Sequence, residues 1–281
     1  MEDTLAGIRG WNRSFLKTSL TTLLTTVGAC VGAAILLTGL TGCNDVFSRS
    51  FASQNSGMEL YRAADYEKAA GAFTDATRQN PRDYKSFFMA GQCYEKMDLE
   101  QKAIASYKTG LSVMDTTDTG RKDDEYRNKF IEELSQTIAT AQSRDTEISS
   151  LEATAHATNR SQDWLLLAKT YVATGDADSA IDAFNRASIQ APTDLKIAKT
   201  YGLYLEGLNQ QKRAEPYLIR AYQLDPTDVE IVKALRRVGI VPGPSLLATG
   251  DLARPIVPKG PVPELQLFPN QTPANQASVG E

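Results

Sequence analysis

A spacing of 34 residues between matching segments is the feature that most restricts how this 281-residue chain can fold. The tetrapeptide Ala191-Pro192-Thr193-Asp194 returns 34 residues later as Asp225-Pro226-Thr227-Asp228. Small and large residues repeat with the same period in two stretches, residues 50–117 and 161–228. A fixed period of this length indicates stacked copies of one supersecondary unit, because a single copy is too small to bury its own apolar face. The pattern predicts four units, which start at residues 50, 84, 161 and 195.

Within each unit, small and large residues hold fixed positions that predict two helices packed closely together. A small residue on each helix lets the backbones approach, and an aromatic residue fills the space beside it. These residues resemble the tetratricopeptide repeat, a 34-residue helix-turn-helix, and the resemblance implies an all-α solenoid. Proline near the end of a unit stops the second helix, and Asp83, Asp194 and Asp228 are expected to cap the next one. The clearest pairs are Gly57, Gly91, Ala168 and Gly202 at the eighth position and Phe73, Tyr107, Phe184 and Leu218 at the twenty-fourth.

The repeat pattern has departures and a less regular middle. Pro216 lies about one turn into a predicted second helix, where it removes a hydrogen bond or delays the helix start. Asp115 stands where a proline is expected. Residues 118–160 still show helical periodicity, so we expect one degenerate helical pair and an uninterrupted solenoid. Residues 229–239 are expected to form a helix that caps the last unit.

The first 42 residues have the pattern of an export signal. Basic residues precede an uncharged stretch that is most apolar over residues 27–37. Leu40-Thr41-Gly42-Cys43 resembles the lipobox of bacterial lipoproteins, and the resemblance implies cleavage before Cys43 and lipid on its thiol. Residues 43–49 would then be a short tether that holds the protein to a membrane outside the cytoplasm. The alternative is an uncleaved anchor, since residues 18–40 are about long enough to span a bilayer.

Composition and residue clusters argue against several classes of function. With 30 basic and 34 acidic residues, the net charge of −4 does not indicate a nucleic-acid-binding protein. The remaining thiol, Cys93, lies in a helical pattern and is expected to be buried and inert. His156 is expected on a helix surface, and adjacent acids such as Glu132 and Glu133 usually only solvate a helix. We therefore predict no enzyme activity, no catalytic residue, no cofactor, no metal site and no small-molecule substrate.

The segment after residue 239 differs from the rest of the chain in composition. Eight of the twelve prolines lie after residue 240, and such a segment favours extended conformations. We predict that residues 240–281 form a disordered tail. The alternative is that the tail docks on the solenoid or on another protein.

In tetratricopeptide repeats, partners usually bind a groove lined by the first helix of each unit. The resemblance places positions 2, 5, 9 and 12 of a unit in that groove. We predict an apolar strip flanked by lysines that select acidic partner residues. The predicted groove residues are Met58, Tyr61, Lys85, Phe88, Gln92, Leu165, Lys169, Lys196, Lys199 and Leu203, and Glu95 also holds a groove position.

These patterns together predict a membrane-anchored scaffold outside the cytoplasm that binds protein segments in a cell-envelope assembly. The resemblance suggests pilus assembly, outer-membrane protein insertion or control of wall hydrolases, without selecting one. Two alternatives stay open: an accessory subunit of an inner-membrane complex with an uncleaved anchor, and a cell-wall enzyme. The inner or outer membrane is also left open.

Overall fold

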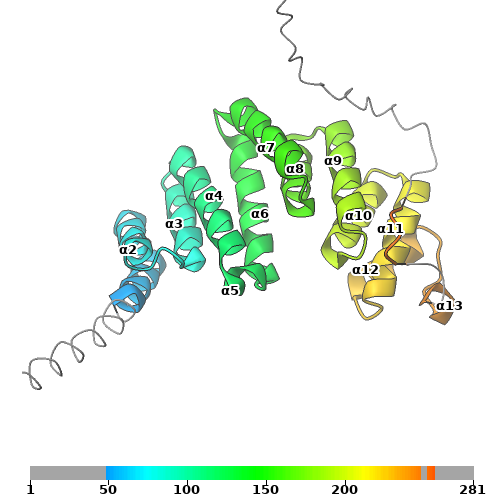
Figure 1. The fold of residues 1–281 in the computed structure, drawn as a ribbon, viewed down its shortest axis with the longest axis horizontal. Helices are drawn as coiled ribbons and strands as arrows, with labels where there is room; N and C mark the ends of the chain where they lie inside the picture. Colours follow the sequence, from blue (N-terminus) through cyan, green and yellow to red (C-terminus); the bar gives the residue numbers. More distant parts are fainter. Residues whose placement is uncertain (1–48, 248–251, 257–281) are drawn as a thin grey trace, which may run out of the picture. The chain divides into compact units, whose positions relative to one another are not determined.

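The computed structural model describes residues 49–247 and 252–256, and these residues are predominantly helical (Figure 1). They fall into two compact units that divide between Arg144 and Asp145. Unit 1 ends at Arg144, and unit 2 begins at Asp145.

Unit 1 is built from antiparallel helix pairs that follow the predicted repeats. A helix over residues 49–62 pairs with α2, and α3 pairs with α4. A further long helix, α6, packs on α4 and α3. The helices are α2 (Tyr66–Gln79), α3 (Tyr84–Lys96), α4 (Glu100–Thr116), α5 (Asp118–Arg121) and α6 (Asp124–Thr140).

Glycine in the first helix of a pair lies directly beneath a large side chain of the second helix. A methyl group added to Gly91 would lie 2.7 Å from the Cδ1 atom of the Tyr107 ring. One added to Gly57 would lie 2.8 Å from the ring of Phe73. These distances are far below van der Waals contact, so only glycine permits this helix spacing. The small residue at the eighth position and the large residue at the twenty-fourth position of a unit therefore contact each other, and this contact recurs from one unit to the next.

Unit 2 repeats the same arrangement. Gly202 lies beneath Leu218, where an added methyl group would come within 2.8 Å of the side chain. The pair α8 and α9 has Ala168 and Phe184 at the equivalent positions, and both are fully buried. The helices are α7 (Arg144–Thr158), α8 (Ser161–Thr174), α9 (Ala177–Gln190), α10 (Leu195–Gly207), α11 (Gln211–Leu224), α12 (Val229–Arg237) and α13 (Pro244–Leu247).

The predicted helix caps are confirmed. The carboxylates of Asp83, Asp194 and Asp228 accept hydrogen bonds from backbone N–H groups in the first turns of α3, α10 and α12. The turn between the two helices of a repeat takes a left-handed residue at the fifteenth position of every unit. Gly175 holds it with φ +80°, and Ala64, Asp98 and Asn209 hold it with φ of 60°, 56° and 58°.

The two departures from the repeat pattern have local structural explanations. Without the usual proline, α4 continues to Thr116, and Asp115 pairs with the buried Arg127 at 2.7 Å. Pro216 lies inside α11, which begins at Gln211, so the proline removes a backbone hydrogen bond without delaying the helix.

Residues 118–160 hold two helices, α6 and α7, of which the first is the longer, and the division between the two units falls between them. The long helix α6 belongs to unit 1 and takes the place of a first helix beside α3. Tyr84 packs on Tyr126, and Phe88 packs on Phe130, each at a sequence separation of 42. Equivalent residues of α3 and α6 are therefore 42 residues apart, which is eight more than the repeat length of 34. The additional residues include the short helix α5.

The end of unit 2 corrects part of the tail prediction. The helix α12 occupies the predicted capping position and buries Ile231, Ala234 and Leu235. Residues 252–256, expected in a free tail, lie against α11. The largely buried guanidinium of Arg220 donates to the backbone oxygens of Pro192 at 3.0 Å, Arg254 at 3.0 Å and Leu252. A buried guanidinium must donate its N–H groups to hydrogen-bond acceptors, and these hydrogen bonds hold residues 252–256 against α11. Residues 257–281 lie outside the described part.

We predict that Gly91→Ala destabilises the fold by about 1–3 kcal/mol, because the added methyl group must displace the Tyr107 ring. Gly71→Ala is the matched control, since Gly71 lies within α2 with nothing within 4 Å of an added methyl group. This control should stabilise by up to about 1 kcal/mol through helix propensity. Denaturant unfolding of both variants measures the difference. Equal effects would show that the close approach at Gly91 does not limit the packing.

Candidate functional site

Two of the predicted groove residues lie in the core. Phe88 is 5% exposed and Leu165 is 3% exposed. The ring of Phe88 packs edge-on against Phe130, with centroids 5.1 Å apart. Leu165 lies in α8, where all five consecutive residues from Trp164 to Ala168 are buried. The prediction that these two side chains form an exposed apolar strip is wrong, because each fills space between helices.

The other predicted apolar groove residues are partly buried. Met58 and Tyr61 pack against the core cluster formed around Phe73 and Cys93. Leu203 is partly exposed on α10. These three side chains leave some apolar surface accessible, although they do not form a continuous strip with Phe88 and Leu165.

The predicted lysines have different surroundings. In unit 2, Lys199 is held by Asp228 at 2.7 Å and Glu230 at 2.6 Å, so its charge is neutralised within the chain. Lys196 is exposed and Lys169 is partly exposed. In unit 1, Lys85 is exposed, and its Nζ lies 3.9 Å from the Asp123 carboxylate and 4.8 Å from the ring centroid of Tyr126.

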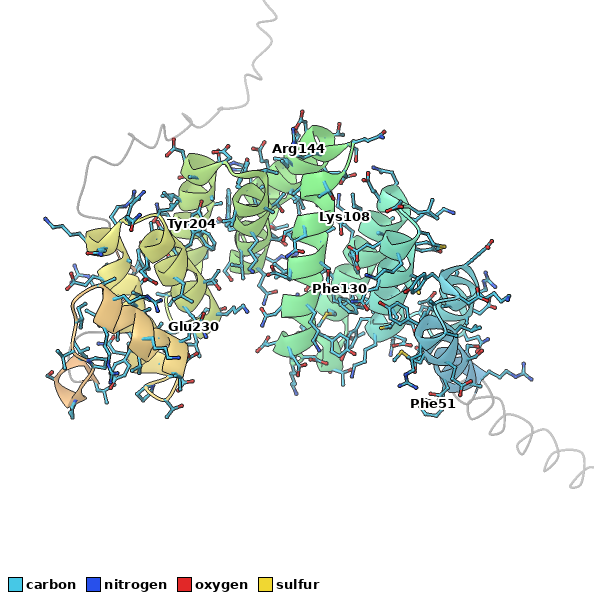
Figure 2. All side chains as sticks on the ribbon, turned by 180° about the vertical axis from the view of Figure 1, so that it is seen from behind. Phe51, Lys108, Phe130, Arg144, Tyr204 and Glu230 are labelled. Atoms are coloured by element: carbon cyan, nitrogen blue, oxygen red, sulfur yellow. The ribbon has the colours of Figure 1, made fainter. Side chains whose placement is uncertain are left out.

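The first helices of unit 1 share one face, which we call the A-helix face: the helix over residues 49–62, α3 and α6. Because α3 and α6 run in the same direction, corresponding residues lie next to one another. Three side chains lie near the N-termini of these two helices: Lys85, Tyr126 and Lys129. The Nζ atom of Lys129 lies 4.7 Å from the centroid of the Tyr126 ring. Nearer their C-termini are Glu95 and Glu133, which we call the acidic pair. Figure 2 shows the side chains of these helices, with Phe130 of α6 labelled.

The acidic pair is half-buried and lies in a network of polar side chains. Gln92 donates to Glu133 at 3.5 Å, and the Thr137 hydroxyl contacts the Glu95 carboxylate. Burial, followed by the negative charge of Glu95, raises the pKa of Glu133 above its ordinary value. The charge of Lys96 acts on the pKa of Glu133 in the opposite direction, although among the described residues no Lys or Arg lies within ion-pair distance of either carboxylate.

Two tyrosines complete the surroundings of the acidic pair. The Tyr107 side chain is fully buried. Burial, then the charge of Glu95 and a hydrogen bond to the same carboxylate, raise the pKa of Tyr107, so its hydroxyl lies beside Glu95. Burial, with smaller contributions from neighbours that include both acidic-pair carboxylates, also raises the pKa of Tyr61. The arrangement is an electronegative patch suited to a positively charged group.

Other predicted residues can be placed or lie outside the described part. Cys93 is buried, as predicted, and burial raises the pKa of its thiol to about 11. His156 is exposed on α7 against the Trp164 ring, as predicted. The lipobox residues Leu40, Thr41, Gly42 and Cys43 lie outside the described residues.

The described part of the chain has neither a metal-binding cluster nor a helix that could span a membrane. No three or more His, Cys, Asp or Glu residues there are grouped so that they could hold a metal ion. None of the helices there combines the length and hydrophobicity needed to cross a bilayer.

Sequence reasoning missed the acidic pair. Glu95 holds a groove position of its repeat, but the eight extra residues before α6 hide its equivalence with Thr137, which lies one helical turn after Glu133. Glu133 also follows Glu132, which suggests a solvated helix surface. Aligning α6 with α3 at a spacing of 42 would have placed Glu133 one helical turn before the residue equivalent to Glu95.

Comparison with known protein families agrees with the helix pairs. Residues 55–112 and 165–229 match the profile of the tetratricopeptide repeat family. These two stretches of the chain are tetratricopeptide repeats. The predicted all-α repeat fold is confirmed, and the matched residues lie within or next to the two predicted stretches. A tetratricopeptide repeat fold is that of a protein-interaction scaffold.

Solved structures of tetratricopeptide repeat proteins resemble this one at low identity. A thermophilic tetratricopeptide repeat protein from Thermus thermophilus is 17% identical, with 68% of this chain and 100% of that chain covered and a TM-score of 0.41. MamA from Desulfovibrio magneticus is 15% identical, with coverages of 64% and 97% and a TM-score of 0.36. YrrB, described as having an unusual peptide-binding site, is 14% identical, with coverages of 66% and 90% and a TM-score of 0.36. A search of curated proteins found no significant match.

We predict that Glu133→Gln stabilises the protein at neutral pH by about 0.5–1 kcal/mol, the scale of one charge interaction near a surface. The amide keeps an acceptor for Gln92 and removes the repulsion from Glu95. Because the folded-state pKa of Glu133 is raised, its ionisation costs stability as pH rises through that pKa. The gain should therefore vanish at acid pH, where the carboxyl is protonated in both the folded and the unfolded state. Urea unfolding of both proteins at several pH values measures it, and a gain that does not depend on pH would contradict the electrostatic explanation.

Proposed function

We propose that this protein is a lipid-anchored scaffold outside the cytoplasm that binds segments of partner proteins on its repeats, within an assembly of the cell envelope. The observation that carries the proposal is the tetratricopeptide repeat itself, which is a protein-binding architecture. The packing of the helix pairs supports recognition by the A-helix face. The second helix of each pair is held against the back of the first, so the first helices of unit 1 present side chains that the repeat contacts do not require.

The proposed anchoring is supported by the sequence of the first 43 residues. Basic residues, an apolar stretch and Leu40-Thr41-Gly42-Cys43 stand in the order used by exported lipoproteins. Lipid on Cys43 would hold the first repeat close to the membrane, because only residues 44–48 separate the anchor from the described helix that includes residue 49. The proposal does not select one envelope process or one membrane. Identification of the partner proteins would determine both.

For the anchor, we predict that the mature protein starts at Cys43 and carries acyl chains. Intact-mass measurement of the protein from its native membrane should show the loss of residues 1–42 and an added lipid mass. Cys43→Ala should leave an uncleaved precursor, since only a thiol can take the lipid. An unmodified wild-type chain that retains residues 1–42 would contradict this anchor and favour the uncleaved alternative.

For partner binding, we predict that Lys85→Glu weakens partner capture about tenfold, because it reverses an exposed charge on the A-helix face. Lys102→Glu is the matched control: Lys102 is also exposed and lies 5.7 Å from a tyrosine ring centroid, but it belongs to the second helix α4. Quantitative mass spectrometry after affinity capture from detergent extracts compares both variants with the wild type. Loss of partners with Lys102→Glu alone would move recognition to the opposite face.

A further inference from the structure

Arg220 of α11 is buried at a position that lies at the surface in the other repeats. It is the twenty-sixth residue of its unit, and the equivalent residues are Asp75, Thr109 and Arg186. The first two are exposed and the third is partly exposed, whereas Arg220 is largely buried. The repeat fold itself therefore leaves this position at the surface, and contacts with residues 252–256 bury it here (Figure 1).

These contacts are made to the backbone of the segment. The Arg220 guanidinium donates to the carbonyl oxygen of Leu252 and, at 3.0 Å, to that of Arg254. One turn later on α11, the Gln223 amide donates to the backbone oxygen of Leu246 at 2.7 Å. Every protein segment carries such carbonyl oxygens, and in an extended chain those two residues apart lie along the same edge. Arg220 can therefore hold extended segments of many sequences.

One side chain of the segment adds a sequence preference. Ile256 lies in a small, largely apolar hollow, which we call the α11 hollow. It lies between the end of α9, the start of α10 and α11, and its lining includes Ala191, Pro192, Ile197, Ala198 and Tyr217. Pro255 precedes Ile256 and restricts the backbone to extended conformations, so binding costs less conformational entropy. The resident segment thus shows which chemistry fits: a large apolar residue directly after proline.

The segment can leave this site without opening the core of unit 2. None of residues 252–256 is fully buried, and the side chains of Ala253, Arg254 and Pro255 are exposed. The preceding helix α13 also buries no residue. In contrast, α12 buries three side chains completely and covers the last helix pair. Residues 252–256 are therefore attached to the outside of a core that α12 already closes, as a bound peptide would be.

We propose that the α11 hollow is a second peptide-binding site, which takes extended partner segments with a large apolar residue directly after proline, and that residues 252–256 occupy it as an exchangeable internal competitor. The inference rests on the proposed function, since it adds a second surface for segments of partner proteins. The internal segment lowers the apparent affinity for a partner in proportion to the time that it fills the hollow.

The test measures binding of a fluorescein-labelled peptide with the sequence of residues 250–258 to the full-length protein in detergent, by fluorescence anisotropy. Ile256→Lys in the protein should release the internal segment, because a lysine would place its charge in an apolar hollow beside the Arg220 guanidinium. The peptide should then bind about tenfold or more tightly than to the wild type, where the attached segment competes. Ala253→Lys is the matched control: it adds the same charge at an exposed position of the segment and should bind the peptide as weakly as the wild type.

Two further changes locate the bound peptide. Arg220→Gln in the Ile256→Lys protein should weaken peptide binding about tenfold, because charged hydrogen bonds to the peptide backbone are lost. Replacing the isoleucine of the peptide with lysine should weaken binding by at least as much, and this change leaves the protein itself unaltered. Circular dichroism and thermal unfolding establish that each protein variant is folded.

The class of partner is tested with random peptides displayed on phage. The Ile256→Lys protein should enrich peptides in which proline is followed by a large apolar residue, and the wild type should enrich this family less. Enriched peptides without this pair would overturn the proposed partner chemistry.

The outcomes separate this inference from the proposed function. If the labelled peptide binds the Ile256→Lys protein no more tightly than the wild type, or if binding does not depend on Arg220 and on the peptide isoleucine, the inference is wrong, while partner capture by the A-helix face stands. If affinity capture finds no partner although the peptide binds as expected, the proposed function fails, and the hollow serves only the chain's own segment. If sedimentation shows that the wild type dimerises, the Ile256→Lys protein stays monomeric and no proline-containing family is enriched, the occupant is a second copy of the chain and the assignment to a partner is wrong.

Discussion

The structure depends on the contact between a residue with little or no side chain on one helix and a large side chain on the next. Gly91 beneath Tyr107 shows it most clearly, and the contact recurs in each repeat. This contact sets the spacing of the helix pair. It also decides which faces remain available, because the second helix is bound to the back of the first. A larger residue at such a position would separate the helices and change every contact stacked on them.

In unit 1 the packing contact and the candidate site share a side chain. The Tyr107 ring fills the space over Gly91 and packs on Phe88 and Phe130, and its hydroxyl is thereby placed beside Glu95. The acidic pair costs folding free energy, since two half-buried carboxylates repel one another. A feature that lowers stability without helping the packing is expected at a binding site more than at a core position. The core supplies the rigidity that holds these groups near one another before a partner arrives.

The candidate site was only partly predictable from the sequence. Lys85, Gln92 and Glu95 hold groove positions by simple counting within a repeat, and the structure places them on the A-helix face. Phe88 and Leu165 hold equivalent positions but are buried, because a position in a repeat does not say whether a neighbouring helix covers it. Glu133 was hidden by the eight-residue shift before α6. Contacts between side chains 42 residues apart required the tertiary structure.

The sequence by itself determined the local elements: the four helix pairs, the aspartate caps, the turn at Gly175 and the burial of Cys93. Each of these follows from residue types at short separations, where periodicity, capping and glycine conformation act directly. Only the tertiary structure decided which charges lie together, which groove side chains are covered, and where the chain after α12 lies. Those outcomes depend on residues far apart in the sequence, such as Arg220 with Leu252 and Arg254, or Glu95 with Glu133. Their proximity arises from the stacking of helices, and no local pattern encodes it.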